Sequence, residues 1–134
     1  MTEPFALDTN VLIYLYEDFD PHKLAVAKGL LADLPKIPAQ VVSEFLNTCR
    51  RLLPLNKTEL LREAALLFRE CQLLPVQPST LEYAAQLCER YKFQLFDAVI
   101  VAAAIEGRCT VLYSEDMQHK LVVDKKLTII NPFL

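Results

Sequence analysis

Four acidic residues stand where their carboxylates could act together on one substrate: Asp8, Glu44, Asp97 and Asp116. Two like charges about 4 Å apart repel each other by roughly 4 kcal/mol at an effective dielectric constant near 20, so four ionised carboxylates would gather only around a compensating cation. Ligands that are all oxygen suit Mg²⁺ or Mn²⁺. Such a site activates a water molecule and stabilises the charge that develops on a phosphoryl group. The acids therefore predict metal-dependent hydrolysis of a phosphodiester bond.

Asp97 is the polar exception in the otherwise apolar segment 95–105. A helix that is hydrophobic on all sides is normally buried, and a carboxylate there needs hydrogen-bond donors, a cation or a metal ion. The structural alternative is that Asp97 starts the helix and accepts hydrogen bonds from its free N–H groups. The presence of three other candidate acids favours the metal-binding interpretation.

Asp8 and Asp116 follow predicted strands. Asp8 comes directly after the apolar run 4–7, and Asp116 comes after the β-branched and aromatic run 109–113. Because open α/β sheets place ligand groups at the carboxyl ends of their strands, we expect both acids at one edge. Glu44 lies at the border of the apolar stripe of its predicted helix, where it could reach the same crevice or simply face solvent.

Strands and helices alternate along the chain and must position these acids. We expect strands at residues 4–7, 35–38, 74–76, 109–113 and 127–130, and helices at 11–16, 21–34, 40–53, 78–91 and 95–105, with another helix that follows Asn56 and ends near residue 73. Residues 8–10 would form a turn, 35–38 an edge strand, and Gly107 a helix cap. The alternation predicts an α/β fold, a three-layer α/β/α sandwich around a mainly parallel sheet of four to five strands, in a single domain over residues 1–134.

The composition excludes several classes of protein. Hydrophobic residues make up 53% and charged residues 23% of the 134 residues, as in globular proteins. Two glycines cannot form a Gly-rich phosphate loop, and four separate cysteines with two distant histidines give little support for zinc. The apolar runs are too short to span a membrane and the N-terminus lacks signal-peptide features, so we expect a cytoplasmic protein. The net charge of −3 argues against binding nucleic acid through bulk positive charge, although a metal ion could bridge an acidic site and a polyanion.

Four motifs, in chain order, resemble those of the PIN domain family. They are Leu7-Asp8-Thr9-Asn10-Val11-Leu12, Val42-Ser43-Glu44-Phe45, Leu95-Phe96-Asp97-Ala98 and Tyr113-Ser114-Glu115-Asp116-Met117-Gln118. Within this family the chain most resembles the VapC-like toxins of bacterial type II toxin–antitoxin pairs. The resemblance extends over nearly the whole chain, and four motifs in order are far more specific than any one of them.

The resemblance implies an endoribonuclease whose acidic quartet binds Mg²⁺ or Mn²⁺. The implied quartet consists of Asp8, Glu44, Asp97 and Asp116. Asn10 and Ser114 would be supporting polar groups. The resemblance also implies a homodimer, an RNA substrate and an antitoxin protein that inserts into or covers the acidic groove. Related sequences often carry a glycine shortly after the last motif, whereas this chain has His119 and Lys120 there, which puts the turn beside Asp116 in question.

Basic residues in two places are candidates for contacts with RNA phosphates: Arg50 and Arg51 after the Glu44 helix, and Lys120, Lys125 and Lys126 near the last acid. Such contacts would position RNA without reading its bases. Arg50 and Arg51 also end a predicted helix, where cations suit the helix dipole. Two other functions stay open. One is a catalytically silent module that engages a protein or RNA through its acidic groove, and the other is a receiver-like phosphoacceptor domain, which the lack of an adjacent acidic pair after the first strand disfavours.

Overall fold

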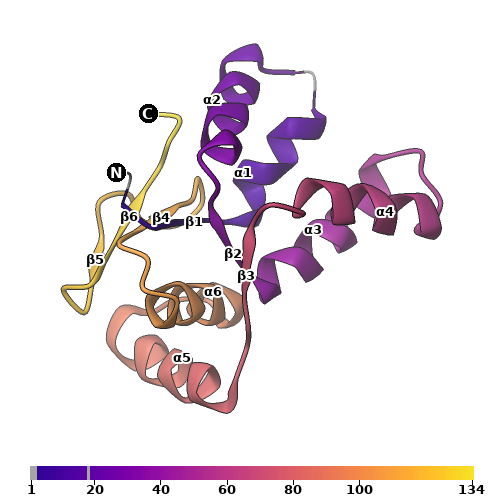
Figure 1. The fold of residues 1–134 in the computed structure, drawn as a ribbon. Helices are drawn as coiled ribbons and strands as arrows, with labels where there is room; N and C mark the ends of the chain where they lie inside the picture. The colour runs from indigo at the N-terminus through magenta and orange to yellow at the C-terminus, as the bar shows by residue number, and fades with distance from the viewer. Residues whose placement is uncertain (1–2, 18) are drawn as a thin grey trace.

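A mostly parallel sheet runs through the middle of the computed structural model, which describes residues 3–17 and 19–134 (Figure 1). Its strands lie in the order β3-β2-β1-β4-β6-β5. They are β1 (Phe5–Leu7), β2 (Lys36–Pro38), β3 (Gln72–Leu74), β4 (Val111–Tyr113), β5 (Val122–Val123) and β6 (Leu127–Ile130). Neighbouring strands are parallel except β5 and β6, which are antiparallel. The predicted sheet is confirmed, with six strands in the described ranges instead of four to five because β5 folds back onto β6.

Helices cover the sheet on both of its faces. They are α1 (Thr9–Ile13), the 3₁₀ helix η1 (Tyr14–Tyr16), α2 (Pro21–Ala32), α3 (Ala39–Leu52), α4 (Lys57–Leu67), α5 (Pro78–Tyr91) and α6 (Leu95–Glu106). In Figure 1, α5 and α6 lie together on one side of the sheet and α1 and α2 lie on the other, while α3 and α4 extend to the side. The predicted α/β/α arrangement is confirmed. Over the described residues, every helix is too short or too polar to cross a bilayer.

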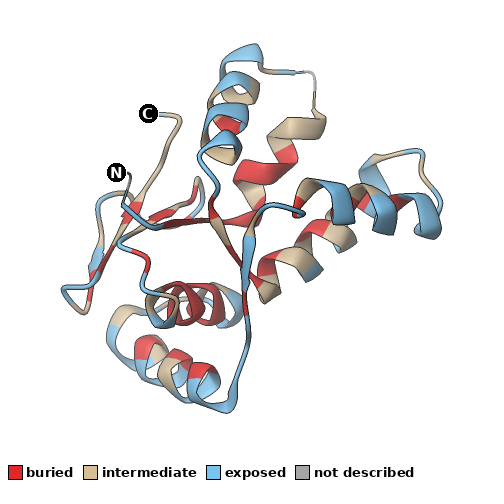
Figure 2. Cartoon of the chain, in the orientation of Figure 1, coloured by how far each residue is buried: buried red, intermediate tan, exposed pale blue. Residues whose placement is uncertain are grey.

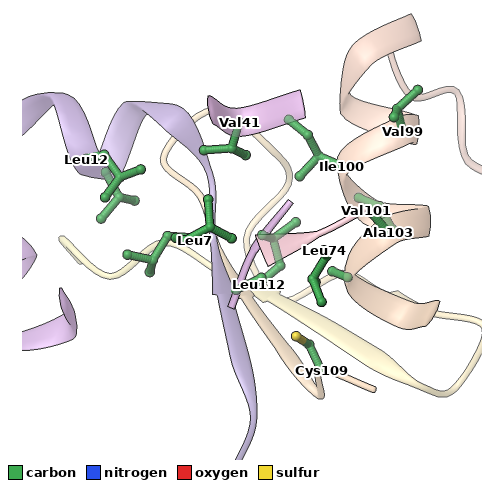
Figure 3. Packing of buried hydrophobic residues seen from close by; sticks show 14 of the residues in the cluster. Leu7, Leu12, Val41, Leu74, Val99, Ile100, Val101, Ala103, Cys109 and Leu112 are labelled. Atoms are coloured by element: carbon green, nitrogen blue, oxygen red, sulfur yellow. The ribbon is translucent and has the colours of Figure 1, made fainter. Parts of the chain in front are cut away.

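One buried cluster joins the sheet to its helices. Leu7 of β1, Leu112 of β4, Ile100 of α6, Val41 of α3 and Leu12 of α1 all belong to it (Figure 3). Each of these side chains is at most 1% exposed. Burying one such side chain stabilises the fold by about 1.5–3 kcal/mol. The cluster therefore fixes the carboxyl ends of β1 and β4 relative to the helices that start beside them.

The helix α6 is buried along most of its length, as its apolar sequence predicts. Every residue from Ala98 to Ala104 is buried, and α6 shows as a nearly continuous buried segment in Figure 2. The first turn is different, since Leu95 is 68% exposed and Phe96 is 53% exposed. The burial expected for an apolar helix therefore does not extend to its first two residues, where the chain reaches the surface.

Hydrogen bonds at the start of α1 overturn the turn expected over residues 8–10. Asp8 has an extended backbone and is the N-cap of the helix, which begins at Thr9. The Asp8 carboxylate accepts a hydrogen bond from the Thr9 backbone N–H. Strand and helix therefore meet without an intervening turn, because a carboxylate satisfies a free N–H group of the first turn.

The helix α4 also has boundaries that the sequence pattern placed differently. Asn56 caps it, and a reciprocal pair of hydrogen bonds with Glu59 forms a capping box. The helix ends at Leu67 instead of near residue 73. Residues 72–74 then form β3, two positions earlier than the strand expected at 74–76. Apolar spacing continued across this boundary, so periodicity alone could not locate the end of the helix.

The segment expected as an edge strand, 35–38, forms β2 between β1 and β3, so its expected edge position is wrong. Proline is usually excluded from such a place because it cannot donate a ladder hydrogen bond. Here the strand is three residues long with Pro38 at its end, and only the pair Ala6 and Lys36 joins it in register to β1. A proline in this position therefore removes few hydrogen bonds.

Gly107 ends α6 as expected, but for a different reason. Its φ of −78° is open to any residue, and Arg108 adopts the left-handed conformation instead, with φ 64°. A Cβ atom on Gly107 would lie 2.6 Å from both methyl carbons of Leu74, which is buried. The glycine therefore allows close packing between the helix end and β3.

Candidate functional site

Asp8 lies at the carboxyl end of β1 and is only 4% exposed. Its Oδ1 accepts a hydrogen bond from the Thr9 N–H at 2.7 Å, and its Oδ2 accepts one from the Ser114 hydroxyl at 2.8 Å. The Asn10 side-chain amide donates a longer bond of 3.4 Å to the same Oδ2. The two supporting residues named from the sequence, Asn10 and Ser114, therefore both contact Asp8 directly.

Burial raises the pKa of Asp8 from 3.8 to about 6. The negative charges of Asp97 and Glu44 act in the same direction, whereas the hydrogen bonds from Ser114 and Thr9 lower the pKa. Desolvation disfavours the ionised form, and neighbouring carboxylates disfavour it further. The ionised form of Asp8 is therefore destabilised in the folded protein, and a bound cation would stabilise it.

Glu44 extends from α3 toward Asp8 and is half-buried. Its Oε1 accepts a hydrogen bond from the Thr9 hydroxyl at 3.0 Å, and its Oε2 accepts one from the Gln40 side-chain amide at 3.2 Å. Glu44 also lines a cavity of about 390 Å³ together with Asn10 and other residues. Both oxygens of this carboxylate are thus oriented, which distinguishes it from a freely solvated helical glutamate.

Asp97 is the third residue of α6, in the first turn. The N-cap is Gln94, whose side chain makes no capping hydrogen bond, so Asp97 is not the residue that caps this helix. Burial raises the pKa of Asp97, and the charges of Glu44 and Asp116 raise it further. A carboxylate in the first turn is stabilised by the helix dipole. The charged side chains that act on Asp97, however, are the acids Glu44 and Asp116, which destabilise its ionised form.

Asp116 follows β4 and is exposed at the rim of the site. It lines the same 390 Å³ cavity as Glu44. The loop that carries it is fixed to the first motif, because the Glu115 N–H donates to Asn10 Oδ1 at 3.1 Å. The Ser114 hydroxyl, which donates to Asp8, also accepts a bond from the Met117 N–H at 3.3 Å. One hydrogen-bond network therefore connects the ends of β1 and β4.

The four acids come from four separate elements and lie near one another at the carboxyl edge of the sheet. The negative charges of Asp97 and Glu44 raise the pKa of Asp8, and those of Glu44 and Asp116 raise the pKa of Asp97. Within residues 3–17 and 19–134, no three acidic, histidine or cysteine side chains already stand close enough to coordinate one ion. The donors are carboxylate oxygens, which suit Mg²⁺ or Mn²⁺, and unscreened carboxylates repel one another. The donor chemistry therefore fits a divalent cation, with side-chain adjustment on binding.

The basic candidates do not line the acidic cavity. None of Arg50, Arg51 and Lys120 lines the acidic cavity. Arg50 lines an apolar groove between α3 and α4, and Arg51 is exposed in the last turn of α3. The structure therefore places none of these three side chains in the lining of the acidic cavity.

A cluster around Glu115 was not anticipated from the sequence. Its carboxylate accepts hydrogen bonds from the Tyr14 hydroxyl at 2.6 Å and from the Lys23 ammonium. Lys23 also lies over the ring of Tyr14, 4.7 Å from its centre. Lys23 and Glu115 are 92 positions apart in the chain, so no local pattern could have revealed their pairing. This ion pair fixes the residue between Ser114 and Asp116.

The departure from the family pattern at His119 and Lys120 has a clear structural form. Lys120 takes a left-handed backbone with φ 69°, a conformation that glycine adopts without strain. Its N–H donates to the Ile129 carbonyl at 2.7 Å, and His119 Nδ1 accepts from the Asn131 N–H at 2.9 Å. The turn therefore forms without glycine, because hydrogen bonds to β6 and to Asn131 just after it hold the backbone in place.

Comparison with known proteins identifies a family model and several solved structures. The model of the PIN domain matches residues 5–125. A toxin–antitoxin complex from Klebsiella pneumoniae has a TM-score of 0.71 at 20% sequence identity, covering 96% of this chain and 97% of that chain. The sarcin–ricin-loop-cleaving toxin VapC20 from Mycobacterium tuberculosis has a TM-score of 0.67 at 19% identity, covering 84% of this chain and 89% of that chain.

DNA-bound VapBC from Salmonella typhimurium is a further example, with a TM-score of 0.67 at 16% identity, covering 96% of this chain and 97% of that chain. At such identities the likeness establishes a shared fold. No curated protein sequence matches this chain significantly.

Proposed function

The chain belongs to the PIN domain family, and on that premise we propose that it is a metal-dependent endoribonuclease and the toxin of a toxin–antitoxin pair. The observation that carries the proposal is the electrostatic linkage of Asp8, Glu44, Asp97 and Asp116 at one edge of the sheet. Solved structures with the same fold include a toxin–antitoxin complex and a toxin that cleaves the sarcin–ricin loop. These support the toxin class and an RNA substrate.

Mg²⁺ or Mn²⁺ is the proposed cofactor, held by Asp8, Asp97 and Asp116. When bound, the ion would supply activation of a water molecule and neutralisation of charge on the scissile phosphate. Asp8 is well placed as a ligand because its pKa near 6 leaves it mostly ionised at neutral pH, while its burial favours a neighbouring cation.

Glu44 is proposed to bind the cation or to orient the attacking water. The bonds from Thr9 and Gln40 fix both of its oxygens, and a fixed carboxylate is suited to accept a proton from water at a defined position. Asn10 and Ser114 act on Asp8 instead, since their side chains direct hydrogen bonds to its Oδ2. Orienting contacts of this kind commonly affect metal affinity or activity by 10–100-fold.

The proposal includes an antitoxin protein as partner, a homodimer and a cytoplasmic location. Toxin–antitoxin complexes among structures of the same fold support the partner. A cationic group of the antitoxin would complement the acidic cavity. Arg50, Arg51 and Lys120 stay predictions for contacts with RNA phosphates outside the acidic cavity.

The decisive experiment is cleavage mapping on total cellular RNA with the purified chain. We expect cuts at defined positions in Mn²⁺ or Mg²⁺, their loss in EDTA, and their return when the metal is restored. Asp8→Asn and Asp97→Asn should each abolish the cuts. Asp33→Asn is the matched control, because Asp33 is an exposed acid that ends α2 outside the site.

Undiminished cleavage by Asp8→Asn or Asp97→Asn in metal-replete buffer would refute the assignment of the site. If the wild type makes no metal-dependent cut in any RNA, the enzyme proposal fails. The acidic groove would then belong to a PIN-like module that engages a protein or RNA without turnover.

A further inference from the structure

A second hollow lies beside the acidic cavity, with a volume of about 220 Å³. Asp116 lines both, so the two hollows meet at this acid. Asp97 lines the second hollow as well. Two aromatic residues, Tyr91 and Phe93, also line it. The hollow therefore combines the acids of the proposed metal site with an aromatic surface, and the nuclease proposal assigns no role to that surface.

The aromatic surface is held in place by hydrogen bonds. The ring centres of Tyr91 and Phe93 are 5.8 Å apart with planes inclined at 43°. The Tyr91 hydroxyl donates to Asp124 Oδ1 at 3.0 Å and accepts from the Asp124 N–H at 2.9 Å. Both aromatic side chains are half-buried. Because Tyr91 is already fixed at its hydroxyl, a ligand that packs on this surface loses little affinity to ordering it.

Polar groups complete the lining. Gln94 and Gln118 also line the hollow, and the side-chain amide of a glutamine offers both donors and an acceptor. Lys92 also lines the hollow, exposed and in a left-handed conformation with φ 58°. Aromatic rings, amides and an ammonium together suit a flat ligand that has a hydrogen-bonding edge and an attached phosphate. A nucleotide has all three features.

We propose that the hollow lined by Tyr91 and Phe93 is a stacking subsite that binds one unpaired nucleobase of an RNA strand whose neighbouring phosphate lies at Asp116. This inference rests on the proposed nuclease function and adds to it a contact between the protein and one base of the substrate. A base held inside a duplex cannot stack on a protein ring, so the RNA is single-stranded where the chain engages it. Stacking on aromatic rings tolerates every base, and discrimination falls to the two glutamine amides.

The test is equilibrium binding of two fluorescent oligomers in Mn²⁺, measured by anisotropy. One oligomer is hexauridylate, and the other is a ribose-phosphate hexamer of the same charge without bases. The protein carries Glu44→Gln, which keeps the three proposed metal ligands Asp8, Asp97 and Asp116 and removes the carboxylate proposed to orient the attacking water, so that binding is measured with little turnover. Phe93→Ala should weaken hexauridylate binding roughly 5- to 150-fold, the usual range for loss of one stacked base. The same substitution should leave binding of the abasic hexamer unchanged.

Two further variants serve as controls. Phe93→Tyr keeps an aromatic ring and should retain the affinity for hexauridylate, which distinguishes lost stacking from a damaged fold. Phe96→Ala removes an equally large side chain that is 53% exposed and does not line the hollow, so it should bind both oligomers as its parent does.

Equal affinity of the parent for the two oligomers, or an equal loss with both in Phe93→Ala, would overturn the subsite. Absence of binding to either oligomer would overturn it too, and a protein partner would then be the better occupant. These results are separate from the nuclease proposal, which stands or falls on metal-dependent cleavage by the wild type.

Discussion

Asp8→Asn should make the metal-free protein more stable while it abolishes cleavage of RNA. Folding raises the pKa of Asp8 from 3.8 to about 6, mainly through burial. The folded chain therefore binds this proton more tightly than the unfolded chain does. The contribution of Asp8 to stability is greatest below pH 3.8 and declines as the pH rises through 6. At pH 7.5 the ionised carboxylate destabilises the fold by up to about 3 kcal/mol.

Asparagine resembles the protonated carboxyl and carries no charge, so it should recover much of this energy. Its Oδ1 can still accept from the Thr9 N–H, and the Ser114 hydroxyl can turn to accept from its Nδ2. The Asn10 amide, 3.4 Å from Oδ2, would face another donor and would reduce the gain. We expect a net gain of about 1–3 kcal/mol at pH 7.5 and about half of it at pH 5.

The assay is urea unfolding of wild type and Asp8→Asn in EDTA at both pH values. Asp33→Asn serves as the control, with an expected change within about 0.5 kcal/mol at either pH. Saturating Mn²⁺ should stabilise the wild type selectively and narrow its difference from Asp8→Asn. An Asp8→Asn protein that is less stable at pH 7.5, or a difference that is the same at pH 5, would refute the reasoning that Asp8 is a buried charge opposed by its surroundings.

Other substitutions test individual contacts. Thr9→Val removes the hydroxyl that bonds Glu44 and should lower kcat about 10–100-fold with little change in stability, as steady-state cleavage and urea unfolding will determine; an unchanged kcat would exclude an orienting role. Asn56→Ala removes a capping box and should cost about 1 kcal/mol by urea unfolding, whereas no loss would mean that the box is redundant. Gly107→Ala places a methyl group against Leu74 and should destabilise the fold by about 1–3 kcal/mol in the same assay. A Gly107→Ala protein as stable as wild type would mean that the helix end relaxes freely.

The sequence predicts the fold class because its elements carry strong local signals. Buried parallel strands appear as continuous apolar runs that end near proline or glycine. This pattern predicted β1, β4 and β6 close to their observed positions. Strand order depends on packing between distant segments. The sequence therefore predicted neither the position of β2 between β3 and β1 nor the antiparallel β5.

For the site, too, the sequence predicts the residue types but not the contacts between distant segments. Residue types and motif order pointed to Asp8 and Asp97, and the structure adds how Thr9 and Gln40 orient Glu44. Gln40 lies four residues before Glu44 on one helix face, a spacing that could have indicated the contact.

Two features of the site lay beyond sequence reasoning. Lys23 and Glu115 pair although they come from distant parts of the chain, and no local spacing in the sequence predicts this contact. Lys120 has a left-handed backbone, a conformation that usually favours glycine. A hydrogen bond from its N–H to the Ile129 carbonyl of β6 holds it there, and this contact depends on the tertiary structure. Both features depend on contacts that exist only once the sheet has formed.

The most direct measurement of the central claim is anomalous diffraction from crystals of the wild type grown or soaked with Mn²⁺. The account predicts a manganese peak at the carboxyl edge of the sheet, with oxygens of Asp8 and of Asp97 or Asp116 about 2 Å away. A crystal of Asp8→Asn treated in the same way should lack or weaken that peak. A wild-type protein that cleaves RNA in Mn²⁺ yet binds the ion elsewhere, or not at all, would contradict the account.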